Sequence, residues 1–552
     1  MGYHLIIAAG FKIFNLKKPY FIKVRRYRKI YQTTLYLLFM KTFKTFIPLK
    51  ATALCAAALL LITSSCKKDR NMEPTQVEVL VPGPNVTVYA VRQDNKLISF
   101  NAQTGAGTNP VDITGMQTGE TMLAIDFRPA TGQLYGVSSG SRIYIINPVS
   151  GAARAVSTTP FTPAIDGTAV GFDFNPTVDR IRLVTSNGQN LRLNPETGGV
   201  AATDGSINGA TGVKISSAAY TENKAGAATT VLFDIDAVTR KLYKQDPPNN
   251  GTLVEVGNLG VEATEVADFD ISPDGRAVLA PITVGGNQGL YLVDLTTGKA
   301  SKSATFSVKV LSLAIPTEKV AYAVTTNNEL LIFNPDSPTP VTKPITGIQT
   351  GEAIVGIDFR PVNGQLYALG STSRVYTINA SSGAAAAVGS VPFSTLLAGT
   401  SFGFDFNPTV DRIRVVSNTG QNLRLNPNDG ALAFVDGPLT VANQFVNGAA
   451  YTNNFAGATT TVLFDINSQN SRLFRQDPPN DGTLVDVGPL GVTVDAANGF
   501  DIGSTSNMAY AVLTVGTTTR IYTINLANGT ATATAAAPFT QTIRGFTLGL
   551  GF

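Results

Sequence analysis

The sequence predicts an all-β protein, and three observations carry this prediction. Only 14% of the 552 residues are charged, while 52 are Gly and 30 are Pro, a composition typical of chains with many turns. Short runs rich in Val, Ile, Tyr and Phe alternate with Gly, Pro and Asn, as consecutive antiparallel strands do. No window has the apolar spacing of about 3.6 residues that indicates a helix.

The N-terminal region has the layout of a secretory signal. From Met40 a basic stretch leads to the apolar run at 51–62, which is too short to span a membrane permanently, and then to TSSC ending at Cys66. We interpret 40–65 as a signal peptide and 1–39 as an over-called start.

The cysteine at the end of this signal indicates an anchor. Its place after small residues resembles a lipoprotein signal of the Bacteroidota type, which implies cleavage before Cys66 and acylation of its thiol. Thr63 stands where the usual motif has Leu, and an ordinary signal peptide or an uncleaved anchor is the alternative. The predicted location is the cell envelope, as an outer-membrane lipoprotein facing the periplasm or the surface. Cys55 leaves with the signal, so no disulfide is expected.

The net charge of +4 comes from the leader. Residues 1–66 contain eleven Lys and Arg and no Asp or Glu, so the rest of the chain has 31 basic and 38 acidic residues, a charge of −7. This balance gives no electrostatic basis for binding nucleic acid, and no nucleic-acid partner is expected.

A long internal repeat divides the chain. The motif IDFRP at 125–129 returns at 357–361, QNLRLNP at 189–195 returns at 421–427, and QDPPN at 245–249 returns at 476–480. The offset is 232 for the first two motifs and 231 for the third. We therefore expect two modules, 86–315 and 316–552, after a linker at 66–85.

Each module contains five shorter units. The unit at 124–157 reads AIDFRP, QLYGVSS, RIYIINP and AARAVS, and corresponding segments recur about every 46 residues. Four-stranded units of this period predict a β-propeller. The chain enters at 86–93 with a second-strand pattern and ends at 545–552 with a first-strand pattern, so the last strand would complete the first blade. We expect two tandem five-bladed rings; one ten-bladed ring is the alternative, because the join at 312–324 has only a short turn.

The modules also resemble a known bacterial domain of unknown function. The resemblance is carried by GIDFRPVNGQLYALGSTSRVYTINASSGAA (356–385), GFDFNPTVDRIRVVSNTGQNLRLNP (403–427) and AAYTNNFAGATTTVLFDI (449–466). It covers 86–552 and implies the propeller fold, and it brings no activity or catalytic residue with it.

An aspartate recurs in the first strand of several units, most visibly in GFDFNPTVDRIR at 171–182 and 403–414. The six positions are Asp126, Asp173, Asp270, Asp358, Asp405 and Asp501. We interpret them as structural, each bonding backbone amides or a nearby arginine such as Arg180 or Arg412 and holding neighbouring blades in register. The alternative is that three carboxylates per ring face the axial channel and bind a cation or an amine.

The residue types available exclude several kinds of site. The only histidine, His4, lies in the leader, so the mature chain has no Ser-His or Cys-His nucleophile, no histidine acid–base catalyst and no ordinary zinc site. No catalytic residue is predicted. Asp268, Asp270 and Asp274 offer a weak candidate site for Ca²⁺, with a Pro-Asp-Gly turn as the alternative, and no other cofactor is expected.

These observations favour a non-catalytic binding or scaffolding protein, anchored to the membrane through lipid on Cys66. Its loops would meet a glycan or another envelope protein. The alternative is a hydrolase or lyase that cleaves glycans with an Asp/Glu pair. A propeller fold hosts both classes, so the fold alone does not choose between them.

Overall fold

The computed structural model describes residues 79–337, 339–440 and 445–552. These residues belong to one compact unit, Val79–Phe552. Their regular structure is β-strand apart from two short 3₁₀ helices, η1 (Pro248–Asn250) and η2 (Pro479–Asp481), so the predicted all-β class is confirmed. The predicted signal peptide and Cys66 lie outside the described residues.

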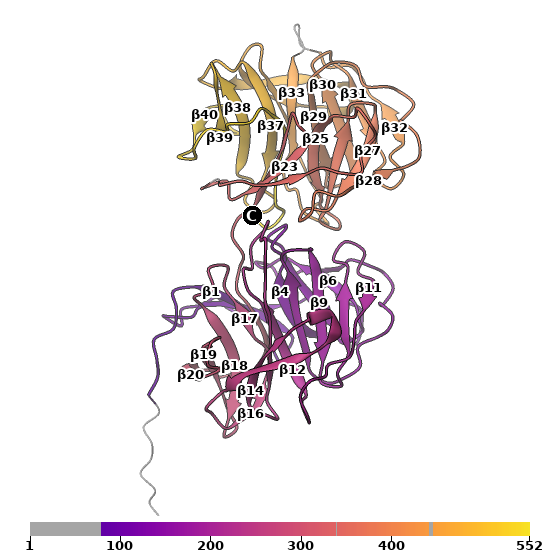
Figure 1. Ribbon diagram of the computed structural model, residues 1–552. Helices are drawn as coiled ribbons and strands as arrows, with labels where there is room; N and C mark the ends of the chain where they lie inside the picture. Colours follow the sequence, from indigo (N-terminus) through magenta and orange to yellow (C-terminus); the bar gives the residue numbers. More distant parts are fainter. Residues whose placement is uncertain (1–78, 338, 441–444) are drawn as a thin grey trace, which may run out of the picture. The chain divides into compact units, whose positions relative to one another are not determined.

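In the first module five antiparallel sheets follow one another (Figure 1). The first joins β1 (Thr87–Arg92), β2 (Lys96–Asn101) and β3 (Val111–Asp112) to β21 (Val310–Ala314). The second is β4 (Met122–Phe127), β5 (Leu134–Ser138), β6 (Ile143–Ile146) and β7 (Ala153–Ala155). The third is β8 (Val170–Asn175), β9 (Arg180–Thr185), β10 (Asn190–Leu193) and β11 (Val200–Thr203).

The two remaining sheets of the first module follow the same order. The fourth is β12 (Ile215–Tyr220), β13 (Leu232–Asp236), β14 (Lys241–Gln245) and β15 (Leu253–Asn258). The fifth is β16 (Ala263–Val266), β18 (Val278–Val284), β19 (Asn287–Val293) and β20 (Ala300–Thr305), with the short β17 (Asp270–Ile271) also paired to β18.

The second module repeats this arrangement. Its first sheet joins β22 (Ala321–Thr325), β23 (Glu329–Phe333) and β24 (Val341–Pro344) to the C-terminal strand β41 (Ile543–Leu548). The second is β25 (Ile354–Arg360), β26 (Gln365–Gly370), β27 (Arg374–Ile378) and β28 (Ala385–Val388). The third is β29 (Phe402–Asn407), β30 (Arg412–Ser417), β31 (Asn422–Leu425) and β32 (Leu432–Val435).

The last two sheets complete the second module. They are β33 (Val446–Tyr451), β34 (Leu463–Asn467), β35 (Arg472–Gln476) and β36 (Leu484–Pro489), followed by β37 (Ala496–Ile502), β38 (Ala509–Val515), β39 (Thr518–Ile524) and β40 (Ala531–Ala533). The four-stranded antiparallel units that the sequence predicts are therefore present in both modules.

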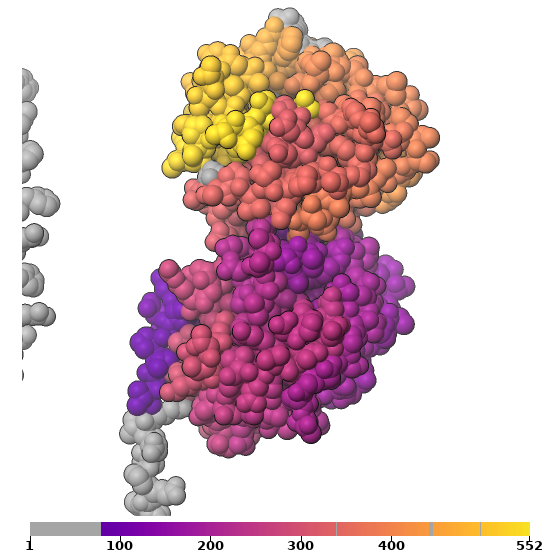
Figure 2. All heavy atoms as spheres, viewed as in Figure 1, coloured from indigo at the N-terminus to yellow at the C-terminus, as the bar shows by residue number. Residues whose placement is uncertain are grey.

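In each module the last strand pairs with the first. Ala314 of β21 lies opposite Tyr89 of β1, and Leu548 of β41 lies opposite Ala321 of β22. On the surface in Figure 2, indigo residues from the start of the first module lie beside pink residues from near its end, and yellow C-terminal residues lie beside red residues of the second module. Because every strand pairs with another strand of the same unit, Val79–Phe552 is expected to fold without the preceding residues.

Innermost strands of neighbouring sheets also touch. In the first module β4, β8, β12 and β17 contact one another in order, and β21 contacts both β4 and β18. In the second module β25, β29, β33, β37 and β41 contact one another in order, and β41 contacts β25. The innermost strands of the second module thus form a complete circuit, and in the first module β18, which pairs with β17, supplies the contact to β21.

The core lies between neighbouring sheets. Tyr135 of β5 and Phe174 of β8 meet edge to face with ring centroids 5.3 Å apart, and Tyr367 and Phe406 repeat this contact at 5.1 Å. The inner strand β12 is buried at every position, whereas the outer strand β11 alternates half-buried and exposed residues. Inner strands are covered on both faces, which is why any polar side chain on them needs a partner within the protein.

Candidate functional site

The six aspartates predicted from the repeats gather into one cluster per module. In the first module the carboxylate oxygens of Asp126 (β4), Asp173 (β8) and Asp270 (β17) lie within 4.8 Å of one another. In the second module Asp358, Asp405 and Asp501 do the same. Each of the six residues is at most 2% exposed.

In the first module each carboxylate accepts a backbone hydrogen bond from the next sheet. Asp126 Oδ2 accepts the N–H of Phe174 at 2.8 Å, and Asp173 Oδ1 accepts the N–H of Tyr220 at 3.1 Å. Asp270 Oδ2 accepts the N–H of the residue directly after β21 at 2.5 Å. The three side chains therefore link the innermost strands around the circuit.

In the second module a hydroxyl joins two of the carboxyls. Thr547 Oγ1 lies 2.9 Å from Asp358 Oδ1 and 2.9 Å from Asp501 Oδ2. One hydroxyl has one proton to donate, so the second contact requires a proton on one of the two carboxyls. Asp405 Oδ2 has no hydrogen-bond partner among the described residues, which also disfavours its charged form.

Burial is the main cause of the raised pKa values in these clusters. It raises the pKa of Asp126, Asp173, Asp358 and Asp405 well above the usual range, and neighbouring carboxylates raise it further. Burial also raises the pKa of Asp270 to about 7 and that of Asp501 to about 6, where backbone N–H bonds oppose the shift. The geometry therefore keeps part of each cluster protonated near neutral pH.

The innermost strands of the second module leave little space between them. One glycine from each innermost strand lines a cavity of ≈ 10 Å³, namely Gly356, Gly403, Gly448, Gly499 and Gly545. A Cβ on Gly403 would lie 2.7 Å from the backbone N of Ala449, so the absence of a side chain permits this close strand approach. Asp358 is two residues after Gly356 and points to the same side of its strand. A cavity of this size holds about one water molecule and no sugar.

The repeated stretch at 171–182 contributes a second link, which the sequence did not reveal. Arg128 Nε donates to Asp179 Oδ1 at 2.8 Å, and its Nη2 bonds Asp179 Oδ2. Arg128 Nη2 also donates to Glu196 Oε1 at 2.6 Å. The side chains of Arg128 and Asp179 are 0% and 1% exposed, so this ion pair between neighbouring sheets is fully buried. Arg128 belongs to the repeated motif IDFRP, which was the available signal.

Arg182, in the same stretch, reaches the following sheet. Its Nη1 donates to Asn190 Oδ1 and Asp204 Oδ2, both at 2.7 Å, and its Nη2 donates to Asn249 Oδ1 at 2.8 Å. Asn249 belongs to the motif QDPPN, so two of the repeated motifs bond each other.

Arg180 and Arg412, which the sequence suggested as partners of the clustered aspartates, form hydrogen bonds to other groups. Arg180 Nη1 donates to the backbone oxygen of Asp179 at 2.7 Å, and Arg412 makes the matching bond to Asp411 at 2.8 Å. The reason is register: Arg180 opposes Asn175 across the hairpin, whereas Asp173 opposes Arg182.

The residues considered for Ca²⁺ lie in two settings. Asp268 and Asp270 are buried and accept backbone N–H groups, whereas Asp274 sits in an exposed turn and accepts the hydroxyl of Ser272 at 2.7 Å. The structure groups Asp270 with Asp126 and Asp173 instead.

One further pair of buried carboxyls escaped the sequence analysis. Asp234 on β13 and Asp465 on β34 are 0% exposed, and neither oxygen of either residue has a hydrogen-bond partner in the described part of the chain. Burial raises the pKa of each to about 8. The pattern LFDI around each of them reads as an ordinary strand, so only the fold shows that both faces are covered.

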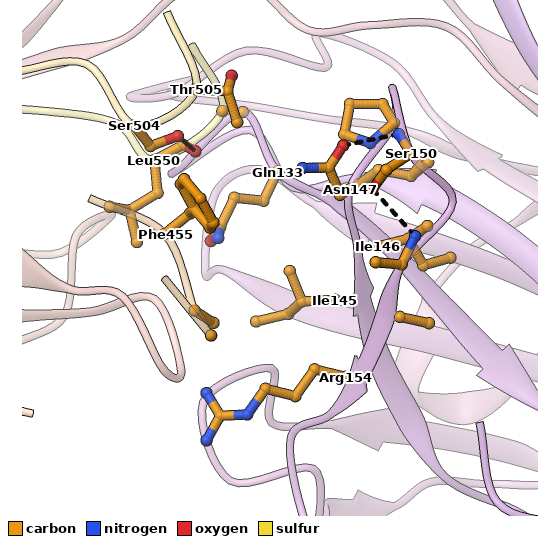
Figure 3. A pocket seen from close by; sticks show the side chains of 18 residues that line it. Gln133, Ile145, Ile146, Asn147, Ser150, Arg154, Phe455, Ser504, Thr505 and Leu550 are labelled. Carbon is orange, nitrogen blue, oxygen red and sulfur yellow. Dashed lines mark hydrogen bonds between the residues drawn. The ribbon is translucent and has the colours of Figure 1, made fainter. Parts of the chain in front are cut away.

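A larger cavity of ≈ 360 Å³ is lined by residues of both modules (Figure 3). Ile145 and Arg154 come from β6 and β7, Gln133 comes from the turn before β5, and Phe455 and Leu550 come from the second module. Its 18 lining residues include no Asp or Glu, and Arg154 is the one charged residue among them. The volume is in the range of small-molecule sites, roughly 300–1,000 Å³.

Two features bear on attachment to a membrane. A search of the described residues finds no helix with the length and hydropathy needed to cross a bilayer. Cys66, predicted to carry lipid, lies outside the described residues.

Comparison with known families gives one clear result. The profile of a domain of unknown function, DUF4394, matches residues 89–314 and 329–547. The chain belongs to this family. The two matches coincide with the two repeats, and the family description assigns no activity. Among curated proteins, none has a significantly similar sequence.

One solved structure similar to the chain is PorZ of Porphyromonas gingivalis, described as an essential bacterial surface component of the type-IX secretion system. The two sequences are 12% identical, and the match covers 83% of this chain and 60% of that chain with a TM-score of 0.24. The chain thus spans 60% of the length of PorZ. A match of this extent carries no conclusion about function.

Proposed function

We propose that this chain is a lipid-anchored, non-catalytic binding or scaffolding protein of the cell envelope, built on two five-bladed β-propellers. Five sheets per module and the circuit of innermost strands support the propeller. In one ten-bladed ring β21 would pair with β22, whereas β21 pairs with β1 and β22 pairs with β41. This pairing supports two rings, with modules at 86–315 and 316–552.

The proposal assigns a structural role to the recurring aspartates. Asp126, Asp173 and their counterparts bond the backbone of the next sheet and are almost fully buried. Carboxylates used as glycosidase acids and nucleophiles must touch a sugar, and these six are at most 2% exposed. The proposal includes no cofactor; Ca²⁺ at Asp268, Asp270 and Asp274 is an outcome that the experiment below would detect.

The observation that carries the choice of binding over catalysis is the larger cavity. It has the size of a ligand site, and no acidic side chain lines it. A hydrolase or lyase working with an Asp/Glu pair needs two carboxylates at the site. The lining instead offers apolar walls with a few polar groups, which is the usual composition of a binding pocket.

The envelope location rests on the sequence. The signal at 40–65 and Cys66 would place lipid at the N-terminus of the mature chain, with 66–85 as a linker to the first propeller. We propose an outer-membrane lipoprotein, facing the periplasm or the surface, whose loops meet a glycan or another envelope protein. The acidic balance beyond the leader speaks against a nucleic-acid partner.

Two measurements test this proposal. The full chain and its Cys66→Ala variant are expressed in a Bacteroidota host, and membranes are separated from soluble fractions; wild type in the membrane and variant in the soluble fraction is the expected result. Val79–Phe552 is then screened by thermal shift against envelope polysaccharides with and without Ca²⁺, since a ligand in excess must raise the melting temperature. Turnover of any polysaccharide, or a wild-type chain found in the soluble fraction, would contradict the proposal.

A further inference from the structure

The larger cavity has walls that an apolar group would fill. Leu134 and Ile146 are buried, Ile145 and Phe455 are half-buried, and all four line the cavity with Leu550. Figure 3 shows Ile145 and Phe455 on different chain segments around the same space. Covering these side chains with an apolar ligand removes them from water, which is favourable by about 25 cal/mol per Å².

A cation also lines the cavity. Arg154 is exposed and forms no ion pair with a carboxylate within the described ranges; its Nη1 donates a long bond of 3.4 Å to the backbone oxygen of Val362. No acidic residue lines the cavity to compete for this guanidinium. An anionic group on a ligand would find a charge-assisted partner here.

We propose that this cavity binds a small anionic ligand that has an apolar body. The apolar body lies against Ile145 and Phe455, and the anionic group pairs with Arg154. The inference rests on the proposed binding role and names the class of ligand. Its test is separate, because dye binding can fail while the Cys66 variant still fractionates as expected and a polysaccharide still raises the melting temperature.

The test uses a matched pair of fluorescent dyes and the unit Val79–Phe552. Anilinonaphthalene sulfonate has an apolar body, one N–H and an anionic group, whereas N-phenyl-1-naphthylamine has the same body and N–H without the charge. We expect saturable binding of the anionic dye at one site, at least fivefold tighter than binding of the neutral dye, on the scale of one good hydrogen bond to a charged group. No saturable binding, or equal affinity for the two dyes, would overturn the proposal.

Variants assign each contact. Arg154→Ala should abolish the difference between the dyes, whereas Phe455→Ala should weaken both at least fivefold. Controls are Arg276→Ala and Phe434→Ala, which remove an exposed arginine and an exposed phenylalanine that do not line the cavity. If Arg154→Ala and Phe455→Ala bind the dyes as tightly as both controls do, the dyes bind elsewhere and the proposed site is wrong.

Discussion

The surroundings of Asp234 on β13 disfavour the ionised form of its carboxyl. Asp234 is 0% exposed, and neither of its oxygens has a hydrogen-bond partner among the described residues. Burial raises its pKa to about 8, and the charge of Arg182 offsets only part of that rise. Asp465 on β34 has the same surroundings and also a pKa of about 8. Asparagine at either position keeps the size of the side chain and removes the titration.

The sign of the pH effect follows from this shift. An Asp carboxyl in the unfolded chain has a pKa of about 3.9. Between about pH 4 and about pH 8 the folded state therefore holds a proton that the unfolded state has released. The free energy of unfolding is highest below this window and falls as pH rises through it. The fall is about 1.4 kcal/mol per pH unit, which gives about 4 kcal/mol for Asp234 between pH 5 and pH 8.

Urea unfolding of Val79–Phe552 across this pH range measures the effect. Asp234→Asn should flatten the pH dependence of stability by about 4 kcal/mol, and Asp465→Asn should do the same through the second module. Asp112→Asn is the control, since its side chain is 72% exposed. If Asp234→Asn keeps the wild-type slope, the carboxyl is not held neutral and the reasoning is refuted.

Three further predictions follow from the same contacts. Asp179→Ala should lower the free energy of unfolding by about 1.5–3 kcal/mol, because the fully buried Arg128 loses its hydrogen bonds to this carboxylate and is left with Glu196 as its acidic partner. Asp411→Ala should cost less, since that ion pair is 11% and 28% exposed; equal losses in urea unfolding would contradict this. Thr547→Val should cost about 1–3 kcal/mol by removing the hydroxyl that joins two carboxyls, and an unchanged melting temperature would count against the shared proton. Asp173→Ala should lower the melting temperature without weakening binding of the anionic dye, and lost dye binding at unchanged melting would reverse its structural assignment.

Sheets were predictable because strand alternation is a local property. In 124–157 the four segments that the sequence marks became β4 to β7, with turns at the Gly and Pro positions. Which strand closes each module was harder to predict. The short join at 312–324 is compatible with β21 pairing onward to β22, and only the pairing of β21 with β1 across the module distinguishes the arrangements.

The site was predictable only where residues repeat. The recurrence of Asp126 and Asp173 singled them out, and both are buried and accept a backbone N–H from the next sheet. Arg128 and Asp179 are 51 residues apart, so their ion pair depends on the contact of two neighbouring sheets. Asp234 gave no signal, because alternation along one strand does not say whether the second face is covered.

The two modules differ most informatively at the larger cavity. Arg154 corresponds to Ala386 in the second module, and Phe455 corresponds to Lys224 in the first. The stretches that are identical in both copies bond neighbouring sheets, so their preservation follows from the frame that both modules need. The contacts between sheets do not depend on the residues that differ between the modules, and two of these residues, Arg154 and Phe455, line the same cavity. A search for the ligand should therefore begin with the residues that differ between the two modules. The Arg154→Ala variant gives the first module the alanine that the second module has at the corresponding position, Ala386, and the matched dyes measure what this change does to binding.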